Sequence, residues 1–286
     1  MLCNFGPQGS NIAQACFRAR VPLIVHFHGY DAYIRSLLKK YRKRYSYMFG
    51  TGFKFVVVSD DMSKQLVFLG CPAAKIMENP YGFDTRIFRQ DEPAKNNKQL
   101  IFVGRFTEKK APDVLITAFY YVLGHVPEAR LIMIGHGKLY KKLVRQIHDL
   151  GIEKSVTLMG FRTQEVVIEE MQRSMVYVQH SITASNGDSE GSPVSIIEAA
   201  GCGLPVVSTK HAGITKSVIH GKTGYLVDEG DWKAMGQYMI KLLNDPELAS
   251  NMGKEGRQHI LQNFNIETQM QKLRDVLKEG SQVNRQ

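Results

Sequence analysis

The chain has 286 residues, of which 43% are hydrophobic and 22% are charged, a composition that excludes intrinsic disorder and fits one large or two modest globular domains. Its formal charge of +10 favours an anionic partner. No apolar run approaches the roughly eighteen residues that span a bilayer, and residues 1–10 have neither the basic nor the apolar region of a signal peptide, so we expect a cytoplasmic protein.

The four cysteines are scattered through the chain, with no CxxC pair and no histidine at metal-ligand spacing; they are Cys3, Cys16, Cys71 and Cys202. This arrangement argues against a structural zinc site and against a disulfide framework. We expect four reduced thiols.

Three β-strands are predicted in the first ninety residues, within residues 22–29, 54–59 and 75–82. Helical segments separate them, and the adjacent Asp60 and Asp61 stand at a predicted helix start, where a capping role is expected. Three strands in so short a segment fall below a typical domain of about 100 to 150 residues. We therefore expect the N-terminal domain to be incomplete.

Residues 35–49, RSLLKKYRKRYSYMF, concentrate the positive charge. Three tyrosines are interleaved with six cations, which are Arg35, Lys39, Lys40, Arg42, Lys43 and Arg44. One interpretation is a solvated helix face, and the main alternative is a surface for an anionic membrane or an acidic acceptor. No nucleic acid partner is expected, because no zinc finger, ribonucleoprotein motif or helix-turn-helix accompanies the stretch.

After a polar linker at residues 88–99, short β-rich runs alternate with amphipathic stretches, which indicates βαβ units and a parallel sheet. The predicted strands occupy 99–105, 129–135, 155–160, 175–179, 204–208 and 224–228, and the predicted helices occupy 112–123, 138–150, 163–172 and 193–202. About six strand–helix units make a complete doubly wound domain. Helical segments at 231–243 and 266–280 close the chain.

Two glutamates flank a predicted helix start in GDSEGSPVSIIEAAGCG, residues 187–203. Ser192 is expected to be the N-cap and Pro193 the first helical residue, with two glycines ending the helix. Glu190 then lies in the loop, and Glu198 lies inside a helix that packs against a sheet. A surface carboxylate is one interpretation, and hydrogen bonding to ligand hydroxyls at the edge of a cleft is the other.

Arg105 directly follows a predicted strand, and Lys110 comes five residues later at the start of the next helical segment. Because open parallel sheets bind ligands at the carboxyl ends of their strands, two cations there can hold a pyrophosphate, with the N-terminus of the 193–202 helix adding N–H groups. Solvated loop residues are the alternative. The run GHGKLY has Tyr140 where a dinucleotide fingerprint needs its third glycine, which disfavours a dehydrogenase.

Seven segments also match a known family: FGPQG (5–9), HGYDAY (28–33), NPYGFDTRIF (79–88), VGRFTEKKAPDVLITAF (103–119), MIGHGKLY (133–140), SITASNGDSEGSPVSIIEAAGCGLPVVST (181–209) and GKTGYLV (221–227). Together they resemble retaining GT-B glycosyltransferases of family 4, most closely the branch that builds exopolysaccharides such as colanic acid or amylovoran. The resemblance covers nearly the whole chain. Its most specific part is the Glu-x7-Glu spacing together with Arg-x4-Lys.

The resemblance implies a binding site for a sugar nucleotide. Glu198 would bind the ribose hydroxyls, and Arg105 and Lys110 would bind the diphosphate and stabilise its charge as it leaves. Since the basic residues take the place of a metal at the diphosphate, neither a metal nor another cofactor is expected.

The resemblance also implies residues around the transferred sugar. Glu190, with the backbone at Gly191 and Ser192, would hold the sugar, and His28 would face it from the first domain. Asp31 would either join this site or cap the next helix. Retention without an evident nucleophile implies a front-face substitution, in which the leaving phosphate helps to deprotonate the acceptor hydroxyl.

Three features depart from the family. Met1 falls close to FGPQG, where the family has a longer beginning, so that about a hundred residues are expected to be missing. Thr215 and Lys216 replace the family's Pro-Glu, which reverses a charge beside the expected donor pocket. His180 precedes Ser181 where the family commonly has proline, and we expect a milder effect there.

The sequence therefore predicts an α/β protein of GT-B architecture, with two Rossmann-like doubly wound domains facing a cleft and the first incomplete. Residues 1–94 would form the acceptor side, 95–264 the donor domain, and 265–286 a helix returning to the first domain. The predicted activity is retaining transfer of a hexose from a nucleoside diphosphate sugar to a lipid-linked oligosaccharide or polysaccharide at the cytoplasmic membrane face. The alternatives are a truncated, non-catalytic nucleotide-sugar-binding remnant and a sugar-nucleotide epimerase.

Overall fold

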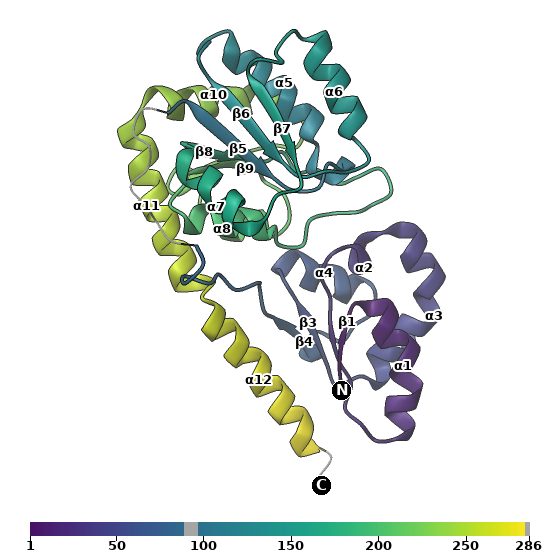
Figure 1. Ribbon diagram of the computed structural model, residues 1–286. Helices are drawn as coiled ribbons and strands as arrows, with labels where there is room; N and C mark the ends of the chain where they lie inside the picture. The colour runs from purple at the N-terminus through teal and green to yellow at the C-terminus, as the bar shows by residue number, and fades with distance from the viewer. Residues whose placement is uncertain (89–96, 284–286) are drawn as a thin grey trace. The chain divides into compact units, whose positions relative to one another are not determined.

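The computed structural model of the protein describes residues 1–88 and 97–283 (Figure 1). The chain forms two compact α/β units, each built on a parallel sheet. The first unit comprises Met1–Gly82, Thr183–Ser192 and the segment from Ile266 onward, and the second comprises Phe83–Ile182 and Pro193–Asn265. The predicted boundary between residues 94 and 95, with most of the predicted linker, lies outside the described residues.

The sheet of the first unit has four strands in the described part of the chain, in the order β1-β2-β3-β4. They are β1 (Leu2–Asn4), β2 (Ile24–His26), β3 (Lys54–Val57) and β4 (Ile76–Glu78). The helices are α1 (Gly6–Arg18), α2 (Tyr30–Tyr33), α3 (Arg35–Thr51), α4 (Asp60–Phe68) and α12 (Ile266–Val283). The three predicted strands are confirmed as β2, β3 and β4. Strand β1 was missed, because its sequence LCN carries two apolar residues and no β-branched or aromatic one.

Both faces of this sheet are covered. Successive side chains of a strand point to opposite faces, so Val25 and Phe55 enter the core beneath α1 and α3, while Ile24 and Val56 pack with Val276 of α12. The closing helix therefore packs with the N-terminal strands, far from it in sequence.

The sheet of the second unit has six strands within the described residues, in the order β10-β9-β8-β5-β6-β7. They are β5 (Gln99–Val103), β6 (Arg130–Ile134), β7 (Val156–Gly160), β8 (Val176–Val178), β9 (Val206–Thr209) and β10 (Gly224–Val227). The helices are α5 (Pro112–Leu123), α6 (Tyr140–Asp149), α7 (Gln164–Arg173), α8 (Val194–Gly201), α9 (Ile214–Ser217), α10 (Trp232–Asn244) and α11 (Pro246–Asn263). The six predicted strands and the α/β fold class are confirmed.

The strand order places a topological switch point between β5 and β8. The chain starts in the middle of the sheet at β5, proceeds outward through β6 and β7, then returns to β8 on the other side of β5. Helices α5, α6 and α10 cover one face of the sheet and share its largest apolar core, while α8 packs against β8, β9 and α11. Ligands of doubly wound sheets bind at the carboxyl ends of the strands beside such a switch point.

Two predicted helix starts need correction. Pro193 has an extended backbone with ψ of 110° and is itself the N-cap of α8, so Ser192 is not the cap. The N-cap of α4 is Ser59, whose hydroxyl accepts from the N–H of Met62 at 3.3 Å; Asp60 is instead the first helical residue. In both helices the N-cap is the residue with an extended backbone just before the first helical residue. The start of α8 therefore lies one residue later than predicted, and the start of α4 lies one residue earlier.

Helix α11 was not predicted, because Gly253 and Gly256 weaken its helical pattern. The structure explains Gly253 by a close approach of two backbones. A Cβ atom at this position would lie 1.9 Å from the carbonyl oxygen of Gly203, closer than any contact allows. This glycine therefore lets α11 pack against the loop after α8.

The four cysteines are all free thiols, as predicted. In the part of the chain that the structure describes, no helix is both long and apolar enough to span a bilayer.

Candidate functional site

Lys110 lies at the switch point of the second unit. It ends the 3-10 turn Glu108–Lys110 after β5, and its Nζ donates a hydrogen bond to Oε1 of Gln179, 3.3 Å away, directly after β8. Its stem passes Gly104, where a Cβ would lie 2.9 Å from the lysine Cδ. The buried lysine is thus held between the two strands that form the switch point.

A polar network connects Lys110 to the first turn of α8. The hydroxyl of Tyr177 lies 3.0 Å from Oε1 of Gln179 and 2.8 Å from Oγ of Ser195. The amide nitrogen of Gln179 donates to Oγ of Ser181 at 2.8 Å. Buried polar groups that are mutually hydrogen-bonded in this way fix one geometry, so the network sets the position of the lysine and of α8.

Arg105 is exposed in the loop directly after β5, and its carbonyl accepts from the N–H of Thr107 at 2.9 Å. Within the described residues its guanidinium has no hydrogen-bonding or ionic partner. The two cations that the sequence singled out therefore lie on one loop, one fixed by a buried network and the other available to a ligand.

Glu198 is half-buried on α8, three residues after Ser195 and therefore on the same face of the helix. Burial raises the pKa of its carboxyl from 4.5 to about 7. No donor in the described part of the chain hydrogen bonds to this carboxyl. A carboxylate in such a place is stabilised by any ligand that brings hydroxyl donors to it.

In the first unit, the loop carrying Glu190 packs against the end of β2. A Cβ at Gly191 would lie 2.8 Å from a methyl of Val58 and 3.1 Å from the carbonyl oxygen of His28, so only glycine fits. Glu190 itself is 6% exposed. The structure therefore places the Glu190 loop beside His28.

The imidazole of His28 is held from both sides. Its Nε2 lies 3.0 Å from Oδ1 of Asn4, and its Nδ1 lies 2.8 Å from the hydroxyl of Tyr81. Because the amide oxygen can only accept, Nε2 carries the proton and the Tyr81 hydroxyl donates to Nδ1. Burial lowers the pKa of His28, which keeps the ring neutral, and burial likewise lowers the pKa of the neighbouring His26, whose ring centroid lies 4.2 Å away, to about 4.

Asp31 has a structural task at this site. Its fully buried carboxylate accepts hydrogen bonds from the backbone N–H groups of Gly6 at 2.9 Å, His28 at 3.1 Å and Gly29 at 2.9 Å. It thereby satisfies the first N–H of α1 and anchors the loop that carries His28. The predicted capping of the next helix is not seen, because Asp31 lies inside α2, whose N-cap residue is Gly29. Burial raises its pKa.

The structure gathers the predicted residues in two groups: Arg105, Lys110 and Glu198 in the second unit, and His28, Asp31, Glu190, Gly191 and Ser192 in the first. Sequence reasoning missed five of their partners, which are Asn4, Tyr81, Tyr177, Gln179 and Ser195. Gln179 directly follows β8, a predicted strand, so the strand-end rule that selected Arg105 would also have selected it. Asn4 ends β1, a strand that was not predicted.

Two departures from the family lie elsewhere in the second unit. Lys216 is exposed on α9. His180 is buried, burial lowers its pKa to about 4, and its Nε2 accepts from the N–H of Gly230 at 2.8 Å. The histidine thus fixes the turn before α10. Among the described residues, no three side chains of the metal-binding types come together.

Comparison with known proteins identifies the family of this chain. The profile of the family Glycosyl transferases group 1 matches residues 83–259. The chain belongs to this family. It is 32% identical over 218 residues to the amylovoran biosynthesis glycosyltransferase AmsK of Erwinia amylovora, covering 76% of this chain and 54% of AmsK. It is 31% identical over 284 residues to the putative colanic acid biosynthesis glycosyltransferase WcaL of Escherichia coli, covering 96% of this chain and 69% of WcaL.

The chain thus spans about half of one relative and about two thirds of the other. Among solved structures, Anabaena HepE in complex with UDP and glucose has a TM-score of 0.84 at 22% identity, covering 97% of this chain and 78% of HepE. This similarity shows a shared fold, and the GT-B fold predicted from the sequence is confirmed.

Proposed function

We propose that the protein transfers a hexose from a nucleoside diphosphate sugar to a lipid-linked oligosaccharide or polysaccharide, with retention and without a metal. The observation that carries the proposal is Glu198, a half-buried carboxyl with a pKa of about 7 and no donor within the described residues. It stands on the helix that the polar network connects to Lys110. A ribose brings hydroxyl donors to the carboxylate, and a diphosphate brings the negative charge that pairs with Arg105 and Lys110.

The first unit carries the residues proposed to act on the sugar. Glu190, with the backbone of Gly191 and Ser192, holds the hexose, and the neutral His28 presents itself to the sugar without adding charge. Retention then follows from a front-face substitution, in which the departing phosphate takes the proton of the acceptor hydroxyl. The names of AmsK and WcaL support a polysaccharide acceptor.

Thermal unfolding with a panel of nucleotides tests the donor part of this proposal. The panel contains uridine, guanosine and adenosine diphosphates and their common hexose conjugates. We expect one base to raise the unfolding temperature, since a ligand at 100 times its Kd stabilises by about 2.7 kcal/mol. Cooperative unfolding that no nucleotide shifts would contradict the proposal. Conversion of a free sugar nucleotide without any acceptor would instead identify an epimerase.

We also propose that α3 holds the protein peripherally at the anionic inner face of the cell membrane. Its six cations are all exposed. Beside them Phe17 of α1 is 59% exposed and packs edge-on against Tyr47, which is 41% exposed, with ring centroids 6.4 Å apart. Cations next to exposed aromatic rings suit a membrane interface, where the charges meet lipid head groups and the rings enter the interfacial layer.

Changing Lys39, Lys40, Lys43 and Arg44 to glutamine is expected to weaken binding to phosphatidylserine-containing vesicles at least tenfold, because each cation near such a surface contributes about 1 kcal/mol. Vesicle sedimentation measures the effect. The matched control changes four exposed lysines of the second unit, Lys141, Lys154, Lys233 and Lys254, to glutamine, with the same loss of charge. Equal binding by the two variants would leave α3 a solvated helix face.

A further inference from the structure

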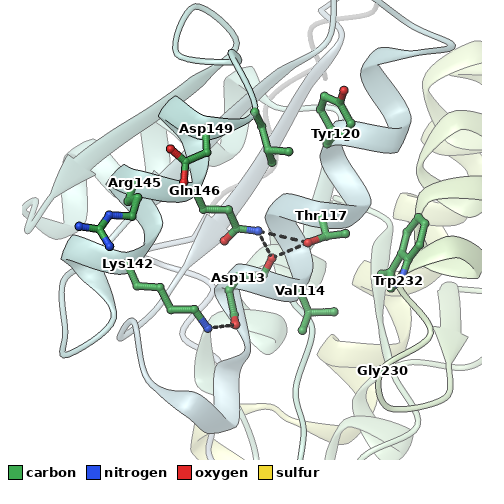
Figure 2. A pocket seen from close by; sticks show the side chains of 11 residues that line it. Asp113, Val114, Thr117, Tyr120, Lys142, Arg145, Gln146, Asp149, Gly230 and Trp232 are labelled. Carbon is green, nitrogen blue, oxygen red and sulfur yellow. Dashed lines mark hydrogen bonds and ion pairs between the residues drawn. The ribbon is translucent and has the colours of Figure 1, made fainter.

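A cavity of about 590 Å³ lies in the second unit between α5, α6 and the turn before α10 (Figure 2). Its size is within the range of roughly 300 to 1,000 Å³ that is usual for small-molecule sites. Figure 2 shows Arg145 and Gln146 of α6 on one side, Trp232 on the other, and Thr117 of α5 between them. None of the residues proposed to bind the sugar nucleotide lines it.

Two aromatic rings at this cavity are open to solvent. Trp232 is 38% exposed and Tyr120 is 50% exposed. The indole packs edge-on against Tyr121, with centroids 6.1 Å apart and an interplanar angle of 70°, which fixes its orientation. The turn that carries it is held by the bond from Gly230 to His180 and by the N-cap at Asp231, whose carboxylate accepts from Ala234 at 3.0 Å. The orientation of Trp232 at the cavity is thus fixed.

The polar groups of the cavity are varied and balanced in charge. Asp113 pairs with Lys142 at 2.7 Å, and Arg145 and Asp149 have no partner in the described part of the chain. Two cations facing two carboxylates do not form an anion site. A ligand without net charge and rich in both donors and acceptors suits these groups better than a phosphate.

Gln146 adds an unsatisfied acceptor. Its amide nitrogen donates to the carbonyl of Asp113 at 2.9 Å and to the hydroxyl of Thr117 at 3.1 Å. Its Oε1 is buried and has no hydrogen-bond partner within the described residues. A buried acceptor without a donor is costly, so a donor brought to it by a ligand hydroxyl would be favourable.

We propose that this cavity is a second glycan-binding site, which holds part of the acceptor or product chain away from the reacting sugar. A pyranose ring has an apolar C–H face for the Trp232 and Tyr120 rings and hydroxyls for Arg145, Gln146 and Asp149. The inference rests on the proposed function in supposing that a glycan is present. Asp113 is only three residues after Lys110, so the cavity starts at the same sheet edge as the diphosphate-binding loop and extends along α5.

The test uses the fact that Trp232 is the only tryptophan of the chain. Its fluorescence is titrated with hexasaccharide fragments of colanic acid and with maltohexaose, and with glucose as the single-ring control. We expect a saturable change with at least one hexasaccharide and a much weaker response to glucose. Tyr120→Ala and Arg145→Ala each remove a contact and should weaken binding about three- to tenfold. Val144→Ala, at an exposed position of α6 that does not line the cavity, should leave it unchanged.

The proposal would be overturned if neither hexasaccharide gave a saturable response. It would also be overturned if Tyr120→Ala and Arg145→Ala both retained the full response. Trp232→Phe, followed by ligand-observed NMR, gives the same decision without the fluorophore: binding reduced relative to the parent supports the site, and unchanged binding rejects it. The titration contains no nucleotide. If no nucleotide shifts the unfolding temperature but a hexasaccharide binds, the proposed transferase is rejected and the glycan site is kept. If a nucleotide shifts the unfolding temperature but no hexasaccharide binds, the glycan site is rejected and the transferase is kept.

Discussion

Arg105→Ala is expected to weaken binding of the preferred nucleoside diphosphate by about 1.5 to 3 kcal/mol, which is roughly ten- to a hundredfold in Kd. The guanidinium has no partner within the described residues, so its removal leaves no buried group unsatisfied in the protein. The whole loss of binding free energy therefore comes from the missing contact between the guanidinium and the ligand. Isothermal titration calorimetry on the parent and the variant measures it directly.

The prediction is specific to the phosphates. Arg105→Ala should leave the weak binding of the uncharged nucleoside nearly unchanged, because only the diphosphate loses a charged partner. Arg105→Lys should recover part of the affinity, since it keeps the charge but not the forked donors. Arg130→Ala is the matched control: Arg130 is also exposed, but it begins β6 and so lies at the amino edge of the sheet. Equal affinity in the parent and Arg105→Ala would remove this loop from the site.

The second unit could be predicted well from sequence for a physical reason. Its strands are buried on both faces and appear as continuous apolar runs, such as the segment that forms β5, and each alternates with an amphipathic helix. The first unit offered less. Strand β1, with the sequence LCN, carries two apolar residues and no β-branched or aromatic one, so it does not stand out as a strand. In the second unit α11 was missed, because it carries Gly253, which only the neighbouring carbonyl of Gly203 explains.

The charged residues of the candidate site could be predicted from the sequence, but their hydrogen-bond partners and pKa values could not. Charged residues after a strand stand out in a sequence, which is why Arg105 and Lys110 were found. Tyr177 and Ser195 do not stand out, because nothing in the sequence shows that they meet at one glutamine side chain. The pKa of Glu198 depends on how deeply α8 packs against β8 and β9, and only the fold shows that depth.

Glu198→Gln is expected to stabilise the ligand-free protein while it weakens nucleotide binding. The folded pKa of about 7 lies above the ordinary 4.5, so burial penalises the charged form. Stability from this group is complete below pH 4.5, falls as the pH rises to 7, and stays low above it. The free energy of unfolding of the variant should therefore exceed that of the parent by about 1 to 2 kcal/mol at pH 8 and by almost nothing at pH 4.5. This gain stays within the limit of ~1.4 kcal/mol for each unit by which the pKa is shifted. Denaturant unfolding at the two pH values measures this difference.

Binding of a nucleoside diphosphate sugar, whose diester phosphates do not titrate near pH 7, should release about half a proton from the parent protein at pH 7, because a carboxyl with a pKa near 7 is half protonated there and ribose hydroxyls favour its charged form. Calorimetric titration in two buffers of different ionisation enthalpy measures the released fraction. Glu198→Gln cannot release that proton, so its binding enthalpy should not depend on the buffer, and its affinity should be about tenfold lower. Proton release that persists in the variant would assign it to another group and leave Glu198 without a role at the ribose. Affinity that rises between pH 6 and 8 in the parent but stays level in the variant would link ionisation of the Glu198 carboxyl to nucleotide binding.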